Sequence, residues 1–251
     1  MRKAVSVLAA LAASLVMVSC TPGSNGAKEQ IRMSASMKEA SIPFHDPATK
    51  PLAAAVATGD VNRIRDLASS HDLSVRGEDG VTLLEWAIWN QQPDALAALL
   101  EAGADPAQAG TDQETVAHMA AMVEDPQYLQ ILIGHGAPVD TVSPRAGWTP
   151  IFRAVQSRRT PQVDLLVQAG ADLQRKDSMG NTLLHVAANV NDAERVLGLL
   201  EAGIDPNATN NRGETFQTAL FAGSDARLNA QARAERQKVR DWLAAHGVAT
   251  P

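Results

Sequence analysis

A six-residue phrase that returns at a nearly constant interval constrains the fold of this chain more than any other feature. The phrase begins at Thr82, Thr115, Thr149, Thr182 and, in degraded form, Thr215. The steps between these residues are 33, 34, 33 and 33, and a Gly follows each of the first four by 21 residues. Such a period is typical of a solenoid, in which one supersecondary unit stacks on the next. We therefore expect a stack of repeats that works through a long surface.

The residues of the six-residue motif indicate which type of repeat this is. It reads Thr-Leu-Leu-Glu-Trp-Ala from Thr82 and Thr-Leu-Leu-His-Val-Ala from Thr182. This pattern resembles the ankyrin repeat, a unit of about 33 residues in which Thr-Pro-Leu-His-x-Ala opens the first of two antiparallel helices. The resemblance covers residues 49–248. It implies an all-α ankyrin-repeat solenoid of about six helix-turn-helix repeats with short β-turn fingers, over residues 48–251.

Local signals agree with a series of helix pairs. Pro93, Pro126 and Pro161 stand where second helices should begin, a position that tolerates a missing N–H. A Gly marks the joining turns, as in Asp79-Gly80, but Gln113 replaces it once, so we expect that turn to differ. In the last repeat, eleven extra residues within 226–240 predict a long charged helix that closes the stack.

The first twenty residues resemble an export signal. Two basic residues precede an apolar run to Val18, which is short for a membrane-spanning helix. The segment Met17-Val18-Ser19-Cys20 resembles a bacterial lipobox, in which the Cys becomes the lipidated first residue. This pattern predicts a signal peptide over 1–19, and a lipidated Cys20 with a flexible tether over 20–47. An ordinary signal peptide cut nearby is the alternative.

The same segment suggests a compartment. Cys20 is the only cysteine, and lipid on it would remove a free thiol from an oxidising environment. An Asp directly after the lipidated Cys favours retention in the inner membrane. This chain has Thr21 at that position instead, which favours the outer membrane. We expect a periplasm-facing lipoprotein in the inner leaflet of the outer membrane, with contact to the membrane only through the lipid.

Charge narrows the class of partner. The full chain carries −6, and loss of Arg2 and Lys3 with residues 1–19 leaves −8. Nucleic acid needs a basic footprint, so this balance excludes it as a partner and favours a basic protein. Acids on or near the expected fingertips could steer such a partner or could form only a solvated rim; they are Glu78, Asp79, Asp112, Glu114 and Glu214.

No pattern of catalytic or metal-binding residues is present in the sequence. His118 and His185 occupy the family's Thr-x-x-His position, where the imidazole is expected to bond locally and stiffen the turn. The remaining His residues stand alone without zinc spacing, and no nucleophile elbow or phosphate loop occurs. We expect no enzymatic activity, no cofactor and no metal.

The resemblance also implies where a protein partner binds. In ankyrin repeats the fingers and first helices line a concave groove, and Trp is frequent at binding hot spots. Trp86 and Trp242 are expected in the core, whereas Trp89 is expected to face the groove unless it folds back over its neighbours. The residues expected to contact a partner are Trp89, Asn90, Met122, Val123, Trp148, Met179, Val190, Asp79, Asp112 and Glu114.

Compartment and binding mode together suggest a function. The chain resembles ankyrin-like immunity proteins that neutralise phospholipase effectors of type VI secretion. Such effectors act on lipid that faces the periplasm, where a tethered inhibitor would meet them at high effective concentration. The alternatives are a periplasmic scaffold that supports oxidative-stress defence beside a catalase, and an adaptor for envelope assembly.

Overall fold

Residues 42–250 are described by a computed structural model and belong to one packed unit. The proposed signal peptide and Cys20 lie outside the described residues. Within this unit six helix pairs follow one another along the chain, which confirms the all-α repeat fold. The pairs are α2 (Lys50–Thr58) and α3 (Val61–Ala68), α4 (Leu83–Trp89) and α5 (Pro93–Glu101), α6 (Val116–Met122) and α7 (Gln127–Gly134), α8 (Pro150–Gln156) and α9 (Thr160–Gln168), α10 (Leu183–Asn189) and α11 (Ala193–Glu201), and α12 (Phe216–Leu220) and α13 (Ala230–Ala245).

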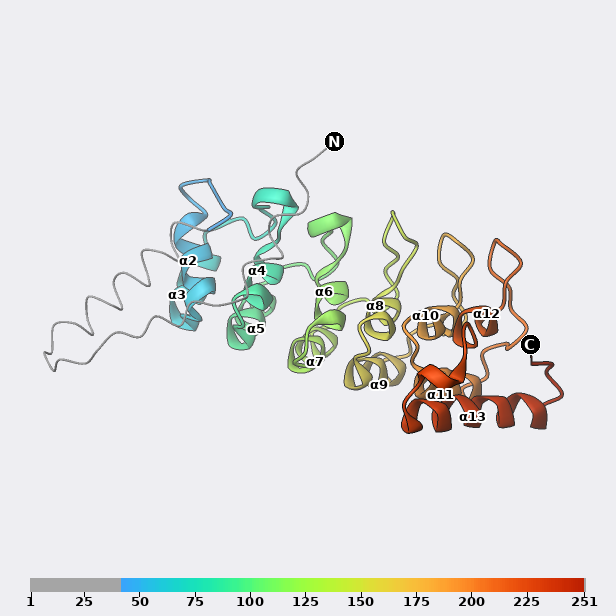
Figure 1. The fold of residues 1–251 in the computed structure, drawn as a ribbon. Coiled ribbons are helices and arrows are strands. Elements are labelled where there is room, and N and C mark those ends of the chain that lie inside the picture. Colours follow the sequence, from blue (N-terminus) through green and yellow to red (C-terminus); the bar gives the residue numbers. More distant parts are fainter. Residues whose placement is uncertain (1–41, 251) are drawn as a thin grey trace, which may run out of the picture. The chain divides into compact units, whose positions relative to one another are not determined.

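The helices stack in two rows. The first helices, α2, α4, α6, α8, α10 and α12, each contact the next member of their row. The second helices α3, α5, α7 and α9 form the other row, and α13 packs on α11. A loop precedes each first helix from α4 onward, and Figure 1 shows these loops projecting on the same side of the rows. We call them fingers 1 to 5, with tips at Asp79, Asp112, Ala146, Met179 and Arg212.

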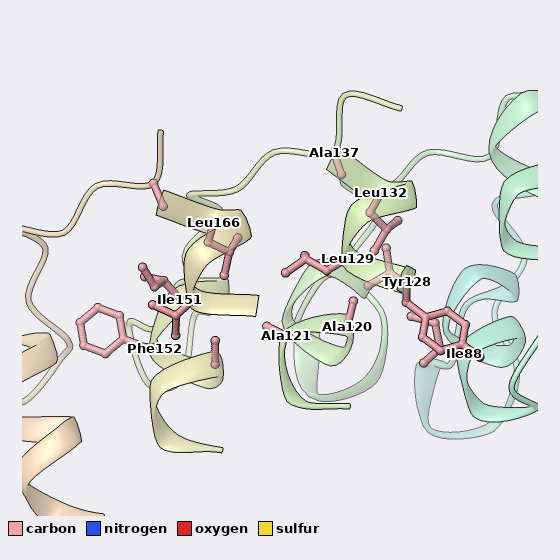
Figure 2. Packing of buried hydrophobic residues seen from close by; sticks show 14 of the residues in the cluster. Ile88, Ala120, Ala121, Tyr128, Leu129, Leu132, Ala137, Ile151, Phe152 and Leu166 are labelled. Atoms are coloured by element: carbon pink, nitrogen blue, oxygen red, sulfur yellow. The ribbon is translucent and has the colours of Figure 1, made fainter. Parts of the chain in front are cut away.

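The core lies between the rows and continues from repeat to repeat. Figure 2 shows Leu129 and Leu132 of α7 beside Ala120 and Ala121 of α6, with Leu166 of α9 following. All five of these side chains are fully buried. Because each helix pair buries its apolar side partly against the next pair, neighbouring repeats stabilise one another.

The packed unit starts before residue 48, where the sequence places the domain boundary. Ile42 and Phe44 are buried in the hydrophobic core, and the Phe44 ring lies 6.4 Å from that of Trp86 in an edge-to-face contact. The main-chain oxygen of Pro43 accepts a hydrogen bond of 2.8 Å from the Glu78 N–H. These contacts make residues 42–44 part of the folded domain and shorten the expected tether.

The backbone of this segment acts as an additional finger. Fingers 3 and 4 are joined by a hydrogen bond of 3.0 Å from Ser178 N–H to Ala146 O, and fingers 4 and 5 by the equivalent bond from Asn211 to Met179. The Glu78 to Pro43 bond repeats this pattern at finger 1. The segment therefore covers an edge that would otherwise present unpaired backbone groups.

Finger 2 keeps the turn of finger 1 despite its Gln. Asp79 and Gly80 have φ of 55° and 81°, and Asp112 and Gln113 have φ of 54° and 61°. The expectation that Gln113 changes the turn is therefore wrong. A bond of 3.1 Å from Gln113 N–H to Gly110 O closes the turn, and the backbone of Gln113 is thereby held in the left-handed conformation that favours glycine.

The long charged helix expected in the last repeat is α13. Arg236 is buried on this helix and lies 3.0 Å from Asp225, which also contacts Arg240 at 2.8 Å. The hydrogen bond from Arg240 holds the pKa of the Asp225 carboxyl below its usual range. From Ile42 to Thr250, no helix is both long enough and apolar enough to cross a membrane.

Candidate functional site

Two histidines link successive repeats. His118 Nδ1 accepts a hydrogen bond of 3.2 Å from Thr115 N–H, so its Nε2 carries the proton and donates to Trp148 O at 3.0 Å. His185 repeats the arrangement with Thr182 and with Glu214 O at 2.9 Å. Burial lowers the pKa of His118. Both imidazoles therefore bond locally, as expected, and each also holds the next finger.

A carboxylate replaces the imidazole in the second repeat. Glu85 accepts hydrogen bonds from Thr82 N–H at 2.8 Å and from Thr111 N–H of finger 2 at 3.1 Å. Burial raises the pKa of this carboxyl. Phe152 occupies the same position in the fourth repeat, and Thr149 Oγ1 is left buried there without a partner.

Trp148 is less accessible than the sequence suggested. Its ring stacks on Phe152 at 6.1 Å, and its Nε1–H donates to Asp177 of finger 4 at 3.1 Å. The Arg153 guanidinium lies 4.8 Å above the same ring. The side chain is half-buried and ties fingers 3 and 4 together, so its main role in the isolated chain is structural.

Glu114 is not a free acid on the rim. It is buried, and both of its oxygens accept hydrogen bonds from Arg153 Nε, at 3.0 and 3.1 Å. Arg153 is thereby held between a finger carboxylate and the Trp148 ring. Arg153 is not among the residues predicted from the sequence, although it follows soon after a stretch without Lys or Arg that runs from residue 77 to residue 144.

The third repeat departs from its neighbours where Met122 and Val123 lie. The links between helices contain a left-handed residue at Gln91, Arg158 and Asn191, whereas Val123 is extended with ψ of 162°. Arg159 and Gln162 of the next repeat bind the main-chain oxygens of Met122 and Val123, at 2.9 and 2.7 Å. The side chains of Met122 and Val123 are half-buried, and that of Val123 packs against the core. Val123 therefore contributes less free surface than expected.

Asn90 and Val190 are the C-cap residues that directly follow helices α4 and α10. The Asn90 side chain donates a hydrogen bond of 2.8 Å to Trp86 O, so its amide is already used within the chain. Val190 is half-buried at the equivalent position. Trp86 itself is buried, with its Nε1–H bound to Ala53 O at 3.0 Å.

Only some of the residues expected to contact a partner are well exposed, and they lie either at a fingertip or at the end of a first helix. Trp89 is 53 % exposed at the end of α4, and Met179 is 51 % exposed at the tip of finger 4. Asp79 and Asp112 are exposed at the tips of fingers 1 and 2. We call the surface formed by the fingertips and the exposed ends of the first helices the finger–helix surface. Within residues 42–250, no group of three or more His, Cys, Asp or Glu side chains is placed to hold a metal ion.

Comparison with known proteins agrees with this geometry. A sequence model for three ankyrin repeats matches residues 90–177 and 117–210. Protein PhlB of Serratia liquefaciens is 41 % identical over 179 residues, which cover 71 % of this chain and 77 % of PhlB. An ankyrin repeat domain from Acinetobacter baumannii AYE superposes with a TM-score of 0.66 at 26 % identity, covering 79 % of this chain and 98 % of that domain.

A larger protein contains a similar segment. SH3 and multiple ankyrin repeat domains protein 2 of Homo sapiens is 32 % identical over 187 residues, which are 72 % of this chain but 10 % of the human protein. The chain belongs to the ankyrin-repeat family. Ankyrin repeats generally mediate protein–protein interaction, and the fold is typically a binding scaffold rather than a catalyst.

Proposed function

We propose that this chain is a lipid-anchored periplasmic protein that binds and neutralises a protein, and that its target is a phospholipase effector of type VI secretion. The observation that carries the binding role is Trp89, an indole 53 % exposed on a first helix where ankyrin repeats present binding residues. Leaving a large apolar side chain in water has no benefit for folding, and Trp is enriched at binding hot spots.

The choice of target rests on the anchor. If Cys20 carries lipid, the domain is confined to a thin layer beside the membrane, which raises its effective concentration toward any enzyme that acts on that surface. A stack of repeats joined by Glu85, His118 and His185 is also stiff. A preformed surface loses little entropy on binding, and this favours tight occlusion of an enzyme.

Protection of cells tests the proposal. A type VI phospholipase effector from the same genome is directed to the periplasm, together with the wild-type chain, Cys20→Ala or Trp89→Ala. We expect survival with the wild type, reduced survival with Cys20→Ala, and cell death with Trp89→Ala at an unchanged protein level. Death of cells that contain the wild-type chain, without formation of a complex, would refute a neutralising role against that effector.

A further inference from the structure

The charges of the chain divide sharply along the stack. Residues 42–125 contain fourteen acidic and four basic residues, a net charge of −10. Residues 126–250 contain twelve acidic and thirteen basic residues, a net charge of +1. Between positions 77 and 144 there are eleven acids and no Lys or Arg. Repeats two and three, from finger 1 to α7, therefore carry a concentrated negative potential.

The exposed indole lies within this acidic stretch. Trp89 ends α4, and the half-buried Met122 occupies the equivalent end of α6 in the next repeat. Exposed acids flank these ends: Asp112 at the fingertip before α6, and Glu124 in the link after it. Among residues 42–250, the carboxylates of Asp79, Asp112 and Glu124 form no ion pair.

A contact within the chain, between the third and fourth repeats, shows how a carboxylate and an indole hold a cation. Arg153 is the one Lys or Arg in the first helices α4, α6, α8, α10 and α12 of the described chain. It lies between the Glu114 carboxylate and the Trp148 ring, with its guanidinium carbon 4.8 Å from the ring centre. A carboxylate of the stretch without Lys or Arg and the indole of finger 3 thus already bind a cation together.

We propose that repeats two and three bind a Lys- or Arg-rich segment of the protein partner that carries apolar side chains. A cationic group of that segment lies on the Trp89 ring, its apolar side chains contact Met122, and the carboxylates of Asp112 and Glu124 attract its charges. The inference rests on the proposed role of the finger–helix surface in binding a protein. It adds the chemistry of the partner and a single direction of docking, since repeats four to six lack the excess of acid.

The test uses a defined probe, so it does not depend on the phospholipase. The probe is a short synthetic peptide of Lys and Leu, with a Glu and Leu analogue as its counterpart. It is titrated into the mature chain, residues 20–251 with Cys20→Ser, while the indole N–H signals are followed by NMR. We expect the Trp89 signal to shift with the Lys peptide and to remain in place with the Glu analogue.

Two matched double variants distinguish a specific binding site from a general attraction of the acidic chain for basic peptides. Asp112→Asn with Glu124→Gln removes two charges from the finger–helix surface, and Asp66→Asn with Glu201→Gln removes two exposed acids from second helices. We expect the first pair to weaken binding about fivefold or more at low salt, and the second pair less than about twofold. Trp89→Ala should weaken it about tenfold.

Three results would overturn the inference: equal losses in the two double variants, signal shifts that leave out Trp89, or no binding of the Lys peptide. Failure of the chain to inhibit the phospholipase would leave this measurement unaffected and would count against the proposed function alone. The two proposals therefore fail independently.

Discussion

His118 Nε2 donates a hydrogen bond of 3.0 Å to the main-chain oxygen of Trp148, which lies in the finger of the following repeat. The same imidazole closes its own helix start through Thr115. One side chain therefore stabilises a turn within a repeat and fixes the spacing between two repeats. We therefore expect the residue three positions after the repeated Thr to stiffen the contact between two neighbouring repeats where it makes both bonds.

Stability should depend on pH through His118. Burial lowers the pKa of this group from 6.5, so the unfolded chain binds a proton that the folded chain resists. The contribution of His118 is present above about pH 6.5 and is lost as the pH falls toward the lower folded pKa. Urea unfolding between pH 7 and 5 should show a falling free energy of unfolding, with a smaller slope in His118→Gln. Equal slopes would contradict the assignment.

Two equivalent threonines should respond in opposite directions to removal of the hydroxyl. Thr115 Oγ1 lies 2.9 Å from His118 Nδ1, whereas Thr149 Oγ1 is buried without a partner. Thr115→Val should cost about 1–2 kcal/mol, and Thr149→Val should be neutral or stabilising by up to about 1 kcal/mol. Chemical denaturation of both variants checks this. A similar loss in both would show that Thr149 has a partner after all.

Replacing the left-handed Gln113 of finger 2 by Gly should increase the stability of the chain. Gln113 has φ of 61°, and Gly adopts this backbone conformation without strain. Gln113→Gly should therefore stabilise the chain by a net amount of roughly 1 kcal/mol, because the relief of strain exceeds the cost of the added backbone freedom in the unfolded state. Gly80→Gln is the matched reverse change. A Cβ there would meet Gly110 O at an ordinary 3.4 Å, so any loss reports backbone strain rather than a clash. Thermal unfolding that moves both variants in the same direction would refute the explanation.

Two tryptophans should separate binding from stability. Trp148→Ala removes a stacked ring and a hydrogen bond to Asp177, and should cost about 2 kcal/mol or more. Trp89→Ala removes a ring that is largely in water, and should change stability by less than about 0.5 kcal/mol. Denaturation curves of the two variants, measured under one set of conditions, decide this. A large loss in Trp89→Ala would mean that the ring supports the fold.

The repeated Thr phrase was sufficient to predict the helix pairs, because the period alone places successive apolar faces against one another. It was also sufficient for the local bonds of His118 and His185, since their partners lie three residues away. The positions of Trp148 and Glu114 depend on Asp177 and Arg153, which lie 29 and 39 residues further along the chain. Such cross-repeat pairs follow from side-chain reach in the folded stack, which a repeat alignment does not contain.

The anchor remains a prediction from sequence, and it has a direct test. Cys20→Ala should abolish acylation and move the chain from the membrane fraction to the soluble periplasmic fraction. Labelling with a fatty-acid analogue and separation of the fractions measure both effects. Ser19→Ala is a suitable control, because it leaves the thiol in place. Retention of an acylated Cys20→Ala variant in the membrane would disprove lipidation at this residue.

The most direct test of the central claim is a titration of the phospholipase effector with the purified mature chain, read as hydrolysis of lipid vesicles. We predict that hydrolysis falls linearly to zero at one chain per enzyme, and that Trp89→Ala shifts the inhibition curve by about 2 kcal/mol or more in binding free energy. Full hydrolysis in the presence of excess wild-type chain, or inhibition by Trp89→Ala equal to that of the wild type, would contradict the account.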